Sequence, residues 1–87
     1  MEIDQLKGLG PKSQQMLKQV GITDAQQFLA CEPFELYRLL KQQIPGVSLN
    51  MLYAILGAQE NVPWQEIKKN RRTEVLLRLD DMGLAPK

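Results

Sequence analysis

The residues most suited to chemistry in this chain are two glycines that flank a leucine, Gly8-Leu9-Gly10, followed at once by proline, lysine and serine. Glycine adopts positive φ without strain and lets an anion approach the backbone, while Leu9 can pack inward and fix the turn. The amides of Gly10, Lys12 and Ser13 would then point from a helix N-terminus, where the helix dipole favours negative charge. This order of residues predicts a phosphate-binding turn.

Basic residues surround the turn. Three lysines lie within residues 7–18, and this stretch contains no acid. Lysines and backbone amides that contact phosphates give an affinity that tolerates any base sequence and falls with salt. We therefore predict a nucleic-acid-backbone site. Its members would be Lys7, Gly8, Leu9, Gly10, Lys12, Ser13 and Lys18.

Residues 6–17 resemble a helix-hairpin-helix motif, since Leu6 precedes the turn and Leu17 follows the second glycine by seven positions. One residue departs from that motif, because Gln14 stands where a small alanine is usual and would hinder a tight helix crossing. The alternative interpretation is a tight connection between two helices with no ligand, as small bundles need. The sequence leaves both interpretations open.

A weaker copy of this pattern begins at Ile44-Pro45-Gly46-Val47-Ser48, and its glycine follows Gly8 by 38 residues. The copy keeps the apolar positions, including Ile55 in the place of Leu17, but it has Ser48 for the second glycine. No basic residue occurs from 42 to 67. We predict two hairpin units packed about a pseudo-two-fold axis, the first retained for phosphate and the second for structure.

The densest positive charge lies near the C-terminus, where residues 68–78 contain five basic residues and one acid, a net charge of +4. Lys68, Lys69, Arg71 and Arg72 form a second candidate patch, because each lysine or arginine on a phosphate steepens the salt dependence of binding. The alternative is a solvated helix face, a common reason for such a charge run.

Composition argues against most enzymes. The 87 residues contain no histidine and a single cysteine, so Ser-His pairs, Cys-His pairs and a four-ligand zinc site are missing. The adjacent acids Asp80 and Asp81 would point about 100° apart on a helix and would not converge on a substrate. We predict a protein that is not an enzyme and has no cofactor and no small-molecule substrate, with Cys31 as a small buried hydrophobe.

Charge and hydropathy predict one cytoplasmic domain over residues 1–87. Eleven basic and ten acidic residues leave a net charge of +1, and 44% of the residues are hydrophobic. No apolar stretch approaches the roughly 20 residues that span a bilayer, and no basic region precedes an apolar one at the N-terminus. A lone cysteine gives no sign of an oxidising compartment. We expect no association with membranes.

Apolar residues recur at helical spacing without period-2 alternation, which predicts an all-α fold, a compact bundle of five or six short helices. The helices are expected from Pro11 to about Val20, after a Thr23–Gln26 capping box, from Pro33, after Ser48 to about Asn61, briefly at Pro63-Trp64, and after Asn70. The helix after Ser48 is apolar nearly all round and should be the most buried. The five aromatics are expected in the core; they are Phe28, Phe34, Tyr37, Tyr53 and Trp64.

Residues 6–22, 47–54 and 62–64 carry a likeness to a known family. They resemble the C-terminal domain of the TfoX/Sxy competence regulators of bacteria, and the likeness extends roughly from Ile3 to Met82. The resemblance implies a helical domain of helix-hairpin-helix type that helps to switch on DNA-uptake genes together with the cyclic-AMP receptor protein or RNA polymerase. Family members usually carry a separate N-terminal domain. This chain has none, so we expect an isolated domain or a free-standing relative.

Two functions compete at this point. The first is a nucleic-acid-binding accessory module that contacts the DNA backbone weakly and without sequence preference. The second is a protein-interaction module in which the hairpin is only scaffold and no DNA is bound. The balanced net charge favours the second, because dedicated DNA-binding domains are usually more basic.

Overall fold

Glycines, prolines and acidic residues set the helix ends in the computed structural model, which describes residues 2–3, 6 and 8–84. Five helices follow in order through these residues, and they are α1 (Pro11–Gln19), α2 (Ala25–Ala30), α3 (Pro33–Gln43), α4 (Leu49–Glu60) and α5 (Trp64–Asp81). The described part of the chain contains no strand, only an isolated antiparallel bridge between Glu2 and Asp24. The predicted all-α fold is confirmed.

Acidic side chains cap two of the helices. The Asp24 carboxylate accepts hydrogen bonds from the amides of Gln26 at 2.9 Å and Gln27 at 3.3 Å, and the Gln27 side chain accepts one from the Thr23 amide. The predicted cap at Thr23 is therefore wrong by one residue, since aspartate is the stronger N-cap. Glu32 caps α3 in the same way, and it accepts from the amides of Phe34 and Glu35.

The last helix differs from the prediction. α5 runs without a break from Trp64 to Asp81, so Asn70 lies inside it and does not cap it. No glycine or proline interrupts residues 64–82, and the Pro63 carbonyl already accepts the first amide bonds of the helix. The Asn70 side chain instead donates to the Glu66 carboxylate at 3.2 Å. A single 18-residue helix thus replaces the predicted short turn and separate final helix.

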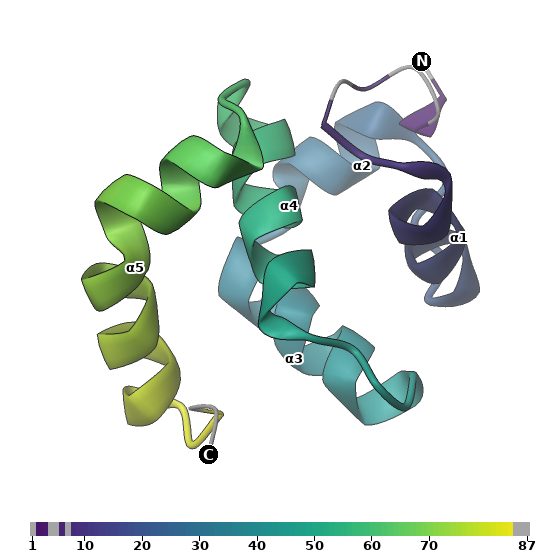
Figure 1. Cartoon of the computed structure of the whole chain (residues 1–87). Coiled ribbons are helices and arrows are strands. Elements are labelled where there is room, and N and C mark those ends of the chain that lie inside the picture. The colour runs from purple at the N-terminus through teal and green to yellow at the C-terminus, as the bar shows by residue number, and fades with distance from the viewer. Residues whose placement is uncertain (1, 4–5, 7, 85–87) are drawn as a thin grey trace.

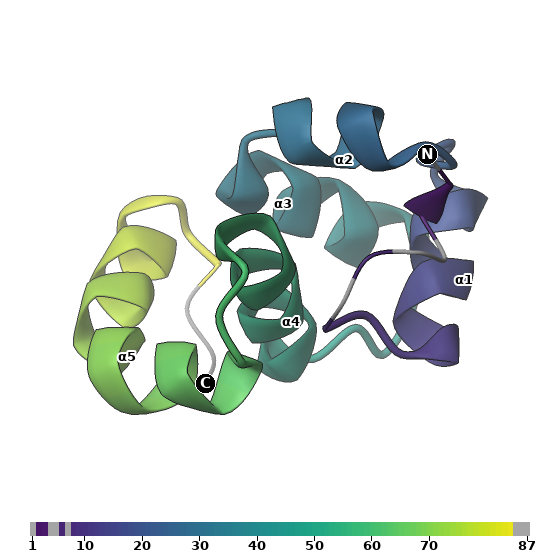
Figure 2. The same cartoon turned by 90° about the horizontal axis from the view of Figure 1, so that it is seen from above.

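α4 is the centre of the fold, as its apolar sequence predicts. It lies between α5 on one side and the α1–α3 half of the molecule on the other (Figures 1 and 2). Its most extensive packing is with α5, and the next is with α3. Seven of its residues are buried, namely Met51, Leu52, Tyr53, Ile55, Leu56, Gly57 and Ala58.

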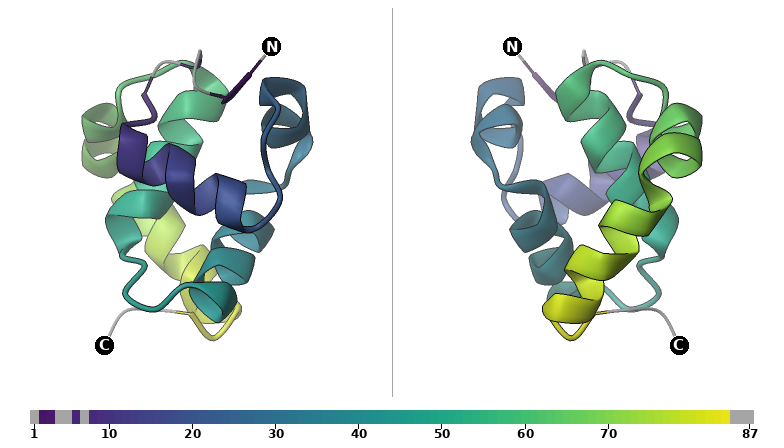
Figure 3. Two further views of the ribbon diagram at one scale, coloured as in Figure 1. Left: turned by 90° about the vertical axis from the view of Figure 1, so that its right-hand side faces the viewer. Right: turned by 90° about the vertical axis from the view of Figure 1, so that its left-hand side faces the viewer.

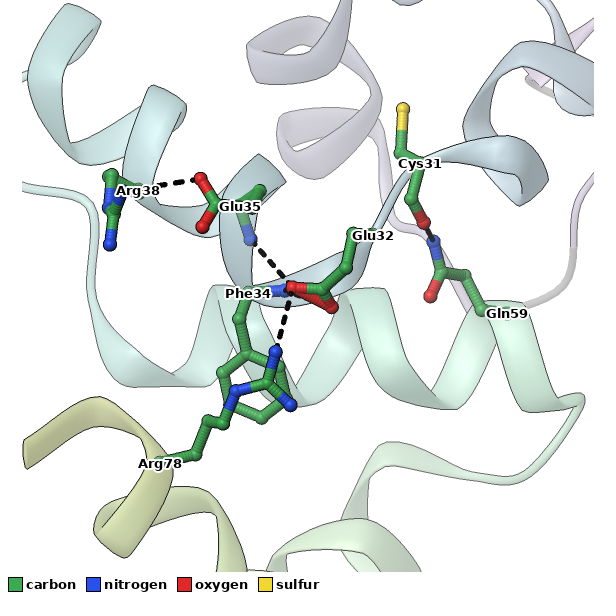
Figure 4. A network of polar contacts seen from close by, with 7 residues as sticks. All are labelled: Cys31, Glu32, Phe34, Glu35, Arg38, Gln59 and Arg78. Atoms are coloured by element: carbon green, nitrogen blue, oxygen red, sulfur yellow. Dashed lines mark hydrogen bonds and ion pairs between the residues drawn. The ribbon is translucent and has the colours of Figure 1, made fainter. Parts of the chain in front are cut away.

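Polar contacts close the bundle around α4 (Figure 4). The Gln59 side chain on α4 donates to the carbonyls of Phe28 and Cys31, at the C-terminal end of α2. From α5, the Arg78 guanidinium lies 4.6 Å from the centre of the Phe34 ring and 3.4 Å from the Glu32 carboxylate. These contacts tie the connection between α2 and α3 to both later helices.

Four of the five aromatic side chains are buried, as predicted, and they are Phe28, Phe34, Tyr37 and Tyr53. Trp64 is half-buried, with part of its surface against the core. Leu29 points outward with 48% of its surface exposed. Among the described residues, no helix is both long enough and apolar enough to cross a bilayer.

Gly57 sets how closely the start of α5 approaches α4. A Cβ at this position would lie 2.6 Å from the Val62 carbonyl oxygen and 3.2 Å from the Trp64 amide nitrogen. Real Cβ atoms do not approach backbone this closely, so only glycine fits there without a shift of the chain. The chain can therefore reverse sharply after α4 and return to it at Trp64.

We expect Gly57→Ala to lower the free energy of unfolding by about 1–3 kcal/mol, because the methyl group forces α5 away from α4. Urea denaturation followed by circular dichroism measures this loss in the free energy of unfolding. The direction of the change in stability distinguishes the two effects, since helix propensity alone would make the alanine variant about 1 kcal/mol more stable than the native chain. A stabilised variant would contradict the close approach.

Candidate nucleic-acid interface

The first glycine turn has the shape that its sequence predicts. Gly8 has φ +92°, Leu9 is buried at 6% exposure, and Gly10 is extended and directly precedes α1. A Cβ at Gly8 would lie 3.7 Å from the backbone of Ala58, so the turn rests on the last part of α4. Lys7, which was predicted to belong to the site, lies outside the described residues.

Gln14 holds this turn in place. Its side-chain Nε2 donates to the Leu9 carbonyl oxygen at 2.9 Å, from the first turn of α1 back to the glycine turn. The residue that departs from the usual alanine of the motif therefore makes a contact that an alanine lacks. Sequence reasoning read Gln14 as an obstacle to packing and missed this contact, since side chains bond locally to a turn only where the fold brings them together.

The chain before the first turn contains no α-helix in its described residues, 2–3 and 6. The Leu6 amide donates to the Ile3 carbonyl at 3.1 Å, and Ile3 is fully buried. In the described part of the chain, Gly8 is thus flanked by one α-helix and Gly46 by two. The predicted pair of equivalent two-helix units is not seen there.

The second glycine turn nevertheless repeats the backbone of the first. Gly46 has φ +81°, Val47 is buried at 5% exposure, and Ser48 is extended and directly precedes α4. The Val47 carbonyl also accepts a side-chain hydrogen bond, from Lys41 Nζ at 3.3 Å. The weak sequence copy therefore corresponds to a true structural repeat of the turn itself.

The helices that follow the two turns begin without a side-chain cap. Neither Gly10 before α1 nor Ser48 before α4 makes a side-chain hydrogen bond to the first amides of its helix. α2 and α3, in contrast, have their first amides occupied by Asp24 and Glu32. α5, which begins after Pro63, also has no side-chain cap. Both helices that follow a glycine turn are thus among the uncapped ones.

Both turns line one surface hollow, which we call the turn hollow. The first turn and α1 contribute Gly8, Gly10, Lys12 and Ser13, and the second turn and α4 contribute Gly46, Ser48 and Asn50. Its volume is about 330 Å³, and Trp64 also lines it. The structure thus brings most of the predicted hairpin residues together and adds the second turn to them.

Two further hollows adjoin the first at Trp64. The neutral hollow, of about 530 Å³, lies between the Gly8–Gly10 turn and the segment from Asn61 to Gln65. The basic hollow is formed on α5 by Trp64, Gln65, Lys68, Lys69 and Arg72. α1 and α5 begin on the same edge of the molecule, on either side of α4 (Figure 2), and Figure 3 views α1 and α5 from the two sides.

Trp64 is the residue of this surface that sequence reasoning missed. It lines all three hollows and so joins the turn to the basic residues of α5. Its spacing from Lys68 and Arg72, four and eight residues along a helix, was the available signal. That signal needed one continuous helix from Trp64, whereas the prediction began a new helix after Asn70.

The predicted basic patch divides into two kinds of residue. Lys68, Lys69 and Arg72 are exposed, and they form no ion pair with any described residue. Arg71 instead pairs with Glu60 on α4 and with Glu74 at 3.1 Å, and these hydrogen bonds, chiefly that to Glu60, raise the pKa of its guanidinium. Arg71 therefore holds α5 to α4.

The remaining candidate positions lie away from the hollows. Lys18 is exposed in the last turn of α1 and lines none of the three. Cys31 is half-buried, its Sγ donates to the Gln27 carbonyl at 3.3 Å, and burial raises the pKa of its thiol. Within the described ranges, no three histidine, cysteine, aspartate or glutamate side chains cluster as metal ligands would.

This geometry defines a small all-α domain with two glycine turns and a row of cations on one face. The family model for the TfoX C-terminal domain matches residues 1–79, and the chain belongs to that family. The family consists of competence regulators and is not known for enzymes. Comparison with curated proteins and with solved structures gave no match.

We expect Gln14→Glu to lower the free energy of unfolding by about 1–2 kcal/mol relative to Gln15→Glu, because a carboxylate cannot donate to the Leu9 carbonyl. The exposed neighbour Gln15 carries the same change of charge in the same helix, so the difference isolates the hydrogen bond. Chemical denaturation measures both variants. Equal stabilities would show that the bond contributes nothing to the turn.

Arg71→Ala should lower the free energy of unfolding by about 1 kcal/mol, whereas Arg72→Ala should leave it unchanged, because only Arg71 bridges α4 and α5. Thermal and urea denaturation of both variants measure this difference. Glu60→Gln should have little further effect in the Arg71→Ala background. Additive losses would show that the two residues do not act as a pair.

Proposed function

We propose that this domain binds the sugar-phosphate backbone of nucleic acid through the turn hollow and the basic hollow. The observation that carries the proposal is the distribution of charge. Lys12, Lys68, Lys69 and Arg72 line these two hollows, and none of the described residues lining either is acidic. An anion there meets positive side chains with no opposing carboxylate in the lining.

The helix starts at the turn hollow add to this attraction. Two uncapped helix N-termini meet there, and each places positive partial charge and backbone N–H groups toward an anion. Glycines at positions 8, 10 and 46 leave the backbone bare of side chains. Phosphate is the anion that such a surface suits when several lysines and arginines lie in a row nearby.

The proposed binding is weak and independent of base sequence. The net charge of the whole chain is only +1, so attraction comes from the local cations and not from a general positive field. Four phosphate contacts to a duplex imply a salt slope near −3.6, or a roughly 100-fold loss of affinity between 50 and 200 mM salt. Such a domain suits a helper of a stronger DNA-binding protein.

In this proposal the domain acts as a non-enzymatic accessory in the regulation of DNA transformation. Contacts to the backbone supply no choice of target, so a partner must supply it. The cyclic-AMP receptor protein or RNA polymerase is the proposed partner, in keeping with a family of competence regulators. The cytoplasm is the compartment in which such a complex would form.

A protein-interaction module without DNA contact is the second candidate. Leu77 on α5 is exposed over 66% of its surface, and the balanced charge of the chain suits a protein partner. A single exposed leucine is common on protein surfaces, whereas a row of cations that form no ion pair with the described residues, beside bare helix N-termini, is a more specific arrangement. The nucleic-acid function is therefore the one we favour.

Fluorescence anisotropy with a labelled DNA duplex of about 20 base pairs tests the proposal at two salt concentrations. Lys12→Ala and Arg72→Ala should each weaken binding several-fold at low salt and each reduce the salt slope by about 1. Arg38→Ala is the matched control, since Arg38 pairs with Glu35 and lines none of the three hollows. Absence of binding at low salt would leave the protein-interaction module.

A further inference from the structure

The neutral hollow has a different chemistry from its two neighbours. Trp64 supplies an aromatic ring, Asn61 and Gln65 supply side-chain amides, and the Gly8–Gly10 turn supplies bare backbone. No charged residue of the described chain lines it. Its volume of about 530 Å³ falls within the roughly 300–1,000 Å³ of small-ligand sites. A flat, uncharged group with hydrogen-bonding edges suits such a lining.

The neutral hollow also adjoins both cationic ones. It shares Gly8, Gly10 and Trp64 with the turn hollow, and it shares Trp64 and Gln65 with the basic hollow. A ligand that follows this surface therefore meets positive charge, then an aromatic and amide-lined site, then positive charge again. A nucleotide chain offers this alternation, because its bases are flat and uncharged and its phosphates are negative.

We propose that the neutral hollow binds one unpaired nucleobase of a single strand, with the neighbouring phosphates in the turn hollow and the basic hollow. Stacking on Trp64 and hydrogen bonds to Asn61 and Gln65 hold the base. The inference rests on the proposed backbone-binding function and adds a preference for single strands, since a base within a duplex is stacked and paired on both sides. Aromatic stacking of this kind accepts any base.

Trp64 is the one aromatic side chain placed to do this. The other four aromatic residues are at most 5% exposed, and they lie within the core. Trp64 is half-buried, so the fold holds one part of the ring while the rest borders the hollows. A ring held in this way pays little conformational entropy when a base stacks on it.

The sequence contains a single tryptophan, so the intrinsic fluorescence of the chain reports on this site alone. We would titrate the full chain at low salt with an unlabelled thymidine oligonucleotide of about 12 nucleotides and, separately, with a duplex of equal length. The oligonucleotide should quench Trp64 fluorescence in a saturable way that added salt reverses. The duplex should quench it far less at equal saturation, measured by anisotropy of a labelled copy.

Variants separate stacking from charge. Trp64→Phe keeps an aromatic ring and should bind the labelled strand within about threefold of the native chain, whereas Trp64→Ala should lose about tenfold or more. Trp64→Ala should weaken duplex binding much less than strand binding, because Trp64 borders the two cationic hollows but stacks only on an unpaired base. Gln65→Ala should weaken strand binding, and Gln26→Ala, an exposed glutamine on α2, is its matched control. Circular dichroism shows whether each variant is folded, and the native titration stands even if Trp64→Ala is not.

The outcomes distinguish this inference from the function on which it rests. Strand binding without quenching, or equal quenching by strand and duplex, would overturn the base site and leave backbone binding intact. Salt-sensitive duplex binding with no binding of the strand would do the same. Absence of binding to either nucleic acid would overturn both.

Discussion

The close approach of the chain to Gly57 is the constraint on which the rest of the surface depends. Because Gly57 has no side chain, the backbone from Val62 to Trp64 folds directly back onto the end of α4. The same stretch of α4 supports the first glycine turn, whose Gly8 faces Ala58. α4 is therefore a platform on which Trp64 and the Gly8–Gly10 turn come to lie side by side. A larger residue at position 57 would separate them.

The charged side chains of this molecule fall into two groups, those that hold the helices together or cap them and those that line the hollows. Arg71 and Arg78 are used inside the fold, where they tie α5 to Glu60 and Glu32, and Asp24 and Glu32 are used as helix caps. Lys12, Lys68, Lys69 and Arg72 line two of the hollows, and the uncapped starts of α1 and α4 border the turn hollow. A net charge of +1 thus hides a surface that is locally positive, because the acids are largely occupied elsewhere.

Much of the fold could be predicted from local patterns. The helix that starts at Pro11 and ends before Gly21, the buried α4 and the positive φ of Gly8 all depend on neighbouring residues, and all are confirmed, whereas Gly10 has a negative φ. The errors at Thr23 and Asn70 arose where two residues compete for one role. Asp24 caps α2 in place of Thr23. Asn70 does not start a helix because α5 already begins after Pro63.

The sequence by itself determined an all-α chain of this family, two glycine turns of the same form and the two clusters of basic residues. Only the tertiary structure decided that these parts meet. The Gly8 and Gly46 turns lie far apart along the chain yet line one hollow. Arg71 differs in role from its neighbour Arg72 because it contacts Glu60. Trp64 joins the turn to the basic residues of α5. The physical reason is that backbone propensities act over a few residues, whereas a binding surface depends on how helices pack across α4.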